Sequence, residues 1–249
     1  MITLYGMGSP NVVKIVIALE EIGQPYALRH VDVMRGEGQH AEFLALNPLG
    51  KVPVMVDGNA AGDVGPIFES GAILIYLAET YAPALLPSSG GERWEVLKWL
   101  IAQVAYAGPM LGQMNHFQLV ASEANSYGGR RYRDMARAVY RDFDARLAQA
   151  PWLGGSSFSI ADIAMYPWAG YLSRHGFSPD DHPHLLAWRD RIDARPSVKR
   201  AAAAIAAMMA AAAPGRPPDG DFDSFFARVE PGPAADLDRY LALGPFTSV

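Results

Sequence analysis

Two short segments of the sequence carry residues that could bind a small peptide. The first is the loop 47–53, with the sequence NPLGKVP, which leads into an apolar run over 54–56. The Val52-Pro53 bond could be cis, because X-Pro bonds lose most of the trans preference of other peptide bonds. A cis bond would turn the N–H and C=O of Val52 outward, where a peptide-like ligand could pair with them. From this dipeptide alone, a trans proline at the entry to a strand is the favoured interpretation.

The second segment is Glu69-Ser70, which opens a helical pattern over 71–79. Ser70 is expected at the N-cap of this helix, where a side-chain oxygen satisfies a free backbone N–H group. A helix N-terminus also attracts carboxylates. One loop could therefore hold the backbone of a peptide while the next holds its carboxylate, and this combination favours the cis form of Val52-Pro53.

Both segments resemble those of the cytosolic glutathione transferase superfamily, in which N-P-x-G-x-V-P supplies a cis-proline loop and E-S-x-A-I the site for the γ-glutamyl group. The resemblance covers residues 1–212. It implies that glutathione is the co-substrate, that Gln39 reaches its glycine end and that Lys51 pairs with one of its carboxylates; a solvated-loop role is the alternative for Gln39 and Lys51. The residues implied to bind glutathione are Gln39, Lys51, Val52, Pro53, Glu69 and Ser70.

Further motifs are similar to those of the bacterial Nu class, which is related to the yeast prion-forming nitrogen regulator. They are PMLGQ at 109–113, NHF at 115–117, RY at 131–132, PWLGG at 151–155 and SIADIA at 159–164. Members of this class bind glutathione and reduce organic disulfides, in several cases with two glutathione molecules or their disulfide in one site. Sphingomonad relatives act on glutathione conjugates of lignin-derived aromatics. The resemblance implies that Arg131, otherwise a surface arginine, reaches a second glutathione, and that His116 and Phe117 shape the second-substrate pocket.

Ser9 and Asn11 are the candidates for the catalytic step, because both stand at the start of a helix predicted for 12–21. A free thiol has a pKa of about 8.5, so stabilising its thiolate by one or two units, or about 1.4 to 2.7 kcal/mol, assists a reaction at neutral pH. One hydrogen bond to a charged acceptor contributes about 1.5 to 3 kcal/mol. Ser9, where the Nu class usually has Thr, could instead act only as an N-cap, so Asn11 ranks first. Tyr5, near the end of the first strand, is expected to pack.

The composition excludes several kinds of chemistry. The chain has 249 residues, half of them hydrophobic, and a formal net charge of only -5, so no basic surface for nucleic acid is expected. It has no cysteine, which excludes disulfides, thiolate metal sites and a cysteine nucleophile, so that both sulfur partners of any exchange must be small molecules. No metal-ligand spacing, secretory signal or membrane-length apolar run is present, and the expected compartment is the cytoplasm.

The predicted elements give the order βαβαββα, which is thioredoxin-like, followed by helices only. The predicted strands are 2–5, 26–33, 54–56 and 67–68, and the predicted helices are 12–21, 41–46, 71–79, 92–107, 132–149, 159–174, 184–194 and 198–213. We expect a thioredoxin-like glutathione-binding domain over 1–82, a linker over 83–91, an all-helical domain over 92–213 and a Pro/Gly-rich extension over 214–249. Ser159 and Asp162 form a capping box. The aromatic residues of the extension, Phe222, Phe225, Phe226 and Phe246, are expected to lie on the body or on a partner subunit.

Together these features predict a homodimeric, glutathione-dependent transferase or oxidoreductase. Its bound thiolate would attack a small disulfide or an electrophile, with Asn11 and Ser9 stabilising the sulfur anion. Two alternatives remain: a non-catalytic member that binds glutathione or proteins, and a lyase that cleaves aryl thioether conjugates of glutathione.

Overall fold

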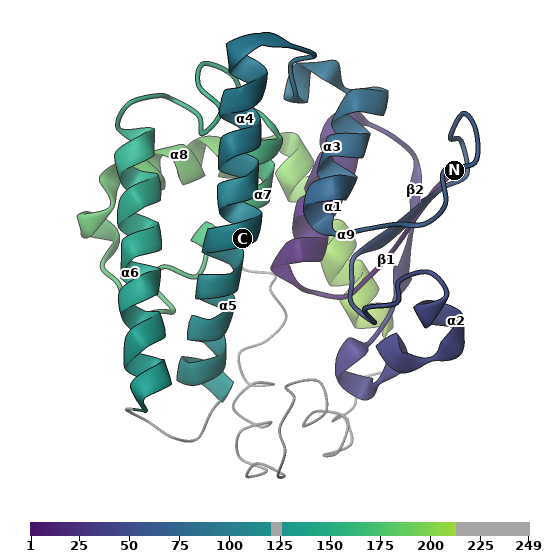
Figure 1. The fold of residues 1–249 in the computed structure, drawn as a ribbon, viewed down its shortest axis with the longest axis horizontal. Coiled ribbons are helices and arrows are strands. Elements are labelled where there is room, and N and C mark those ends of the chain that lie inside the picture. The colour runs from purple at the N-terminus through teal and green to yellow at the C-terminus, as the bar shows by residue number, and fades with distance from the viewer. Residues whose placement is uncertain (121–125, 213–249) are drawn as a thin grey trace.

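The computed structural model of this protein describes residues 1–120 and 126–212. Figure 1 shows two halves side by side, a sheet flanked by helices and a group of helices. The extension 214–249, with the four phenylalanines for which packing was predicted, lies outside the described residues.

The sheet has the mixed topology of a thioredoxin-like domain, as predicted. Its strands are β1 (Ile2–Gly6), β2 (Tyr26–His30), β3 (Val54–Asp57) and β4 (Ile67–Phe68). They lie in the order β2-β1-β3-β4, and β1 pairs parallel with β2 and antiparallel with β3. Leu4 is thereby paired with Leu28 on one side and with Met55 on the other, in the middle of the sheet.

Alternate residues of β1 face two different cores, as the period of a strand requires. Ile2 and Leu4 belong to the main core, which α1 (Pro10–Ile22) and α3 (Ser70–Tyr81) cover. Tyr5 belongs to a smaller core with α2 (Ala41–Leu44), where its ring lies 6.4 Å from that of Phe43. Tyr5 therefore packs, as the sequence predicted. Figure 1 places α1 and α3 between the sheet and the helical half.

The helical half follows a 3-10 turn, η3 (Pro83–Leu85). Its helices are α4 (Gly90–Ala102), α5 (Gly108–Asn115), α6 (Tyr127–Leu147), α7 (Ile160–Ala169), α8 (Pro183–Asp193) and α9 (Pro196–Ala211). Two π-helical turns, η4 (Gln103–Ala107) and η5 (His116–Val120), continue α4 and α5. Within residues 1–120 and 126–212, the structure has no helix that is both long enough and apolar enough to cross a bilayer.

Several predicted boundaries differ from the structure, and helix α5 was not predicted; three of the differences have a clear local cause. The second strand ends at His30 instead of residue 33, because the Asp32 carboxylate accepts hydrogen bonds from two following N–H groups and starts the 3-10 turn η1 (Val33–Arg35). α6 begins before residue 132, because the Ser126 hydroxyl caps it by accepting from the N–H of Gly129 at 3.0 Å. α7 ends at Ala169 instead of about residue 174, with a proline inside its last turn, which removes a helical hydrogen bond.

The predicted capping box is present at the start of α7. The fully buried Asp162 carboxylate accepts from the N–H of Ser159 at 3.0 Å and from its hydroxyl at 2.9 Å. It also accepts from the N–H of Leu153 and from the indole Nε1 of Trp188, both at 2.8 Å. One buried carboxylate thus joins the start of α7 to the preceding loop and to α8. A capping box in an isolated helix would make only the bonds to Ser159.

Replacing this carboxylate should destabilise the whole protein. In Asp162→Ala, four buried donors lose their acceptor, and we expect the free energy of unfolding to fall by about 3 kcal/mol or more. Urea unfolding followed by circular dichroism measures the loss. The exposed Asp134→Ala on α6 is the control and should change stability by less than about 0.5 kcal/mol. Equal stabilities of the two variants would contradict this account of the capping box.

Candidate functional site

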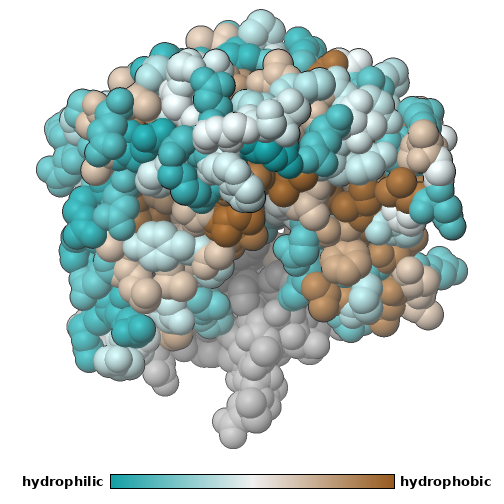
Figure 2. All heavy atoms as spheres, turned by 45° about the horizontal axis from the view of Figure 1, so that its top comes forward, coloured by the Kyte–Doolittle hydropathy of each residue, from teal (hydrophilic) through white to brown (hydrophobic). Residues whose placement is uncertain are grey.

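A cavity of about 310 Å³ lies where the N-termini of α1 and α3 meet the loop 47–53. Seven of the predicted site residues line it: Ser9, Asn11, Lys51, Val52, Pro53, Glu69 and Ser70. Figure 2 shows apolar side chains at the surface of both the left and the right part of this view. Residues from distant parts of the sequence thus converge on one site.

The N-terminus of α1 supplies Ser9 and Asn11. Ser9 has an extended backbone and is the N-cap, as predicted, and its C=O accepts from the N–H groups of Val12 and Val13 at 3.0 and 2.9 Å. Its hydroxyl makes no capping hydrogen bond, so capping does not occupy this group. Asn11 is half-buried at the second helical position. A hydroxyl, an amide and the positive end of the helix therefore stand together at the cavity.

The loop 47–53 has the geometry that its sequence predicted, because the Val52-Pro53 bond is cis. Asn47, which is only 2% exposed, holds the loop: its Nδ2 donates to the C=O of Lys51 at 2.7 Å, and its Oδ1 accepts from the N–H of Leu49 at 3.0 Å. Gly50 between them has a φ of 63°, a conformation that glycine adopts without strain. Asn47 also lines the cavity, a role that sequence analysis missed.

The segment Glu69-Ser70 differs from the prediction in one respect. Glu69, not Ser70, is the N-cap residue of α3, and Ser70 is the first helical residue. Glu69 has a φ of 67°, which costs energy for a residue with a side chain and is found most often at functional sites. Its conformation places an exposed carboxylate at the cavity, directly beside the buried Ser70 and the free N–H groups of the helix.

The remaining predicted residues lie outside this cavity lining. Gln39 is exposed at the end of the 3-10 turn η2 (Glu37–Gln39) and lies against Gly50, next to the loop that carries Lys51. Arg131 lines a separate cavity of about 570 Å³ on α6, together with Tyr106 and Tyr127. Their roles in binding glutathione stay predictions.

His116 and Phe117 belong to an aromatic cluster at the end of α5. Their rings lie 5.2 Å apart, and Phe117 stacks on Tyr132 of α6 at 5.5 Å. This cluster joins α5 to α6, and its part in a second-substrate pocket stays a prediction.

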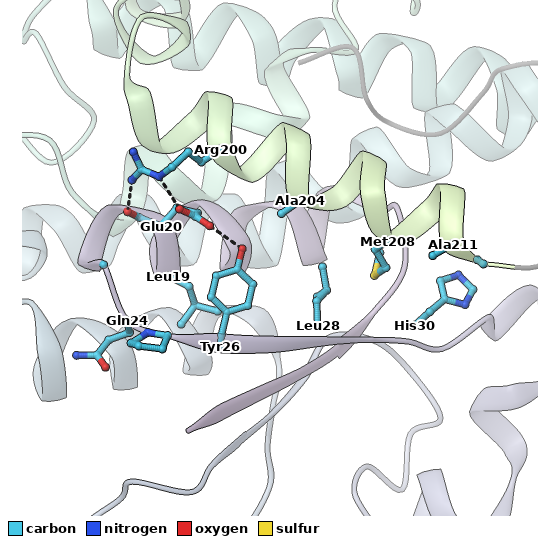
Figure 3. Close-up of a pocket in the computed structure, with 13 residues that line it drawn as sticks. Leu19, Glu20, Gln24, Tyr26, Leu28, His30, Arg200, Ala204, Met208 and Ala211 are labelled. Carbon is cyan, nitrogen blue, oxygen red and sulfur yellow. Dashed lines mark hydrogen bonds and ion pairs between the residues drawn. The ribbon is translucent and has the colours of Figure 1, made fainter.

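A larger cavity, of about 750 Å³, lies elsewhere, between the end of α1, strand β2 and α9. Figure 3 shows Tyr26 pointing from β2 to Glu20 on α1, and Arg200 reaching Glu20 from α9; both donate to the Glu20 carboxylate at 2.7 Å. None of the predicted site residues lines this groove. Its main polar groups pair with each other, so the smaller cavity is the better candidate for chemistry.

Three side chains from the helical half form hydrogen bonds with α1 or with the turn that precedes it. The indole Nε1 of Trp168 donates to Oδ1 of Asn11 at 3.4 Å. The Gly8 N–H donates to the sulfur of Met209 at 3.2 Å, which supports the turn before Ser9. Gln103, in the π-turn η4, accepts from the Lys14 ammonium at 2.8 Å. Sequence analysis missed all three contacts, because no motif links their partners.

Lys14 is a buried cation below the site, only 1% exposed. Burial lowers the pKa of its ammonium to about 7, and the Glu69 carboxylate offsets part of this shift.

In the part of the chain that the structure describes, no group of three or more His, Cys, Asp or Glu side chains could hold a metal ion. The charged side chains among the residues that line the cavity are those of Lys51 and Glu69.

A thioredoxin-like sheet followed by a helical half, with a cis-proline loop and two helix N-termini at one cavity, is the architecture of a glutathione transferase. Residues 1–79 match the family model for the glutathione S-transferase N-terminal domain, and residues 132–196 match the model for the C-terminal domain. The disulfide-bond oxidoreductase YfcG of Escherichia coli (strain K12) is 40% identical over 203 residues, which cover 81% of this chain and 94% of that protein. The chain belongs to the glutathione S-transferase family of enzymes.

Two solved structures of relatives contain glutathione or its disulfide. The glutathione transferase homologue from Lodderomyces elongisporus, crystallised with two GSH per subunit, is 35% identical, with a TM-score of 0.76 and coverage of 80% of this chain and 96% of that one. The glutathione transferase from Pseudomonas putida, with one glutathione disulfide bound per subunit, is 32% identical to this chain, with a TM-score of 0.75. The match covers 80% of this chain and 90% of that one.

The buried Lys14 should make stability depend on pH. Its pKa is about 7 in the folded protein and near the ordinary 10.5 in the unfolded chain, so between these values unfolding takes up a proton and the free energy of unfolding rises with pH. The slope approaches about 1.4 kcal/mol per pH unit. We expect this rise between pH 7 and 10 in wild type and not in Lys14→Met, measured by urea unfolding. The exposed Lys98→Met should retain the wild-type dependence; parallel curves for wild type and Lys14→Met would contradict the prediction.

Proposed function

We propose that this protein is a glutathione-dependent disulfide reductase that works through a stabilised thiolate of bound glutathione. The observation that carries the proposal is the convergence of Ser9, Asn11, the cis-proline loop and Glu69-Ser70 on one cavity. The α1 N-terminus suits a thiolate, and the α3 N-terminus suits a carboxylate. Glu69 offers a carboxylate for the ammonium of a γ-glutamyl group, and Lys51 a cation for a carboxylate. YfcG, a disulfide-bond oxidoreductase by name, supports the same activity.

The cis-proline loop would hold the peptide part of glutathione. The N–H and C=O of Val52 are the natural partners of an extended ligand backbone, and Pro53 fixes their direction. Gln39, beside Gly50, is positioned to reach the glycine end of the same ligand.

The reaction balances with small molecules alone. The thiolate of the first glutathione attacks one sulfur of the disulfide substrate, the S–S bond breaks, and the leaving thiolate takes a proton from water. A second glutathione attacks the mixed disulfide, which gives glutathione disulfide and the second free thiol. Two glutathione thiols are oxidised and one disulfide is reduced. Since the chain has no cysteine, no covalent intermediate with the protein forms.

The second glutathione needs a place in the helical half. We assign Arg131 to one of its carboxylates, with His116 and Phe117 as walls of the second-substrate pocket. Relatives crystallised with two glutathione molecules or with glutathione disulfide support this stoichiometry. We also propose that the protein belongs to the Nu class and that it works in the cytoplasm, where thiols are kept reduced. Its proposed domain division is 1–82, 83–91, 92–213 and 214–249.

Asn11→Ala tests the proposed mechanism. Loss of one hydrogen bond to a charged sulfur should lower kcat/KM for glutathione-dependent disulfide reduction by about 10- to 100-fold. Calorimetric titration with glutathione and with its disulfide, on the same samples, separates binding from turnover. Asn59→Ala, an exposed asparagine outside the cavity, is the matched control and should behave as wild type.

The same assays decide between the candidate functions. Tight binding of glutathione without turnover of any disulfide or electrophile would favour a binding protein. Cleavage of β-aryl thioether conjugates in preference to disulfides would favour a lyase. If neither glutathione nor its disulfide binds, the proposed function is wrong.

We further propose that the chain forms a homodimer through the exposed face of α4. Trp94 and Ile101, seven residues apart and therefore on one face of the helix, are 65% and 52% exposed. Such large apolar side chains favour burial against a second copy. Analytical ultracentrifugation should give a dimer for wild type and a folded monomer for the double variant Trp94→Glu, Ile101→Glu. Ala203→Glu, at an exposed position of α9, should remain dimeric; a monomeric wild type would contradict the proposal.

A further inference from the structure

The amide of Asn11 has two chemically opposite ends, and only one of them can stabilise an anion. Its Nδ2 group donates hydrogen bonds and its Oδ1 accepts them. If the oxygen faced the cavity, it would repel a thiolate; if the nitrogen faced it, it would stabilise one. The orientation of this side chain therefore decides whether the proposed chemistry works.

One hydrogen bond, from Trp168, distinguishes the two ends of this amide. Its indole Nε1 is a donor only and lies 3.4 Å from the Oδ1 of Asn11, across the boundary between the two halves of the molecule. The flipped amide would set two N–H groups against each other. Within the described residues, no acceptor pairs with the Asn11 Nδ2 group, which leaves this donor to the cavity that Asn11 lines.

The indole ring of Trp168 is itself held in place. It is only 7% exposed, on α7, whose start is fixed by the buried Asp162. Its six-membered ring lies over Gly108 and Gly112, one turn apart on α5, where added Cβ atoms would already be in contact with it at 3.8 and 3.7 Å. Tyr171 packs beside it with the ring centres 6.0 Å apart. The ring therefore packs against α5 on one side and Tyr171 on another, with its N–H directed at α1.

We propose that Trp168 is a positioning residue that turns the donor end of Asn11 towards the sulfur of bound glutathione. The inference rests on the proposed function and extends it, because it makes the helical half part of thiolate stabilisation in the other half. Trp168 touches Asn11 and acts on the sulfur only through it.

The pKa of the bound glutathione thiol tests this directly. Because the chain has no cysteine, the ultraviolet absorbance of a thiolate can come only from the ligand, and its pH titration reports that pKa. In Trp168→Phe, and in Trp168→benzothienylalanine, where sulfur replaces the ring N–H with little change of shape, we expect a rise of about one unit. The turnover at neutral pH should fall up to about tenfold, with the affinity for glutathione nearly unchanged.

Two comparisons separate positioning from a general loss of structure. Trp99→Phe removes another indole N–H of the helical half, which packs on Phe143 and not on Asn11, and should leave the thiol pKa at its wild-type value. The double variant Asn11→Ala, Trp168→Phe should be no worse than Asn11→Ala alone, because Trp168 acts through Asn11.

Either of two results would overturn the inference alone: Trp168 variants that bind glutathione with the wild-type thiol pKa, or full additivity in the double variant. A wild-type protein whose bound glutathione titrates like free glutathione, or that binds none, would instead overturn the proposed function, and the inference with it.

Discussion

The site depends on one constraint: helix α1 must be buried on every side and still present its first turn to the cavity. Residues 12–19 of this helix are all buried, between the sheet, α3, α7 and α9. Burial on this scale fixes the helix axis, so its N-terminus cannot move independently of the core. The partial positive charge of that N-terminus is thereby held at one point of the cavity, which is the condition for stabilising an anion without reorganisation.

The two halves of the molecule have different tasks at this point. The sheet half supplies the groups that face the cavity, from α1, the loop 47–53 and Glu69-Ser70. The helical half supplies groups that hold them from behind, through Trp168 on Asn11 and Gln103 on Lys14. Asn11 and Lys14 lie about one helical turn apart, so the helical half makes two hydrogen bonds to the same face of α1. Lys14 loses solvation where it lies, which lowers its pKa to about 7, and the Glu69 carboxylate at the cavity offsets part of this shift.

Local sequence predicted those parts of the site that depend on local geometry. The N-cap at Ser9 and the capping box at Asp162 each follow from a few neighbouring residues, the cis bond at Val52-Pro53 was favoured only in combination with Glu69-Ser70, and the structure has all three. The positive φ of Glu69 left no signal in the residue type, since glutamate normally avoids this conformation. The pairs Lys14–Gln103 and Asn11–Trp168 join residues 89 and 157 positions apart, and only the packing of α1 against the helical half brings them together. The sequence therefore identified the side chains that line the cavity, but not Trp168 and Gln103, which contact α1 from the helical half.

The most direct test of this account is a crystal structure of the protein with glutathione bound. We predict that the glutathione sulfur lies within about 3.5 Å of both Nδ2 of Asn11 and the hydroxyl of Ser9, with Oδ1 of Asn11 turned to Trp168. The γ-glutamyl carboxylate should lie at the N–H of Ser70, and the ligand backbone should pair with Val52. A glutathione molecule whose sulfur points away from the α1 N-terminus, or that binds in the groove between β2 and α9, would contradict the account.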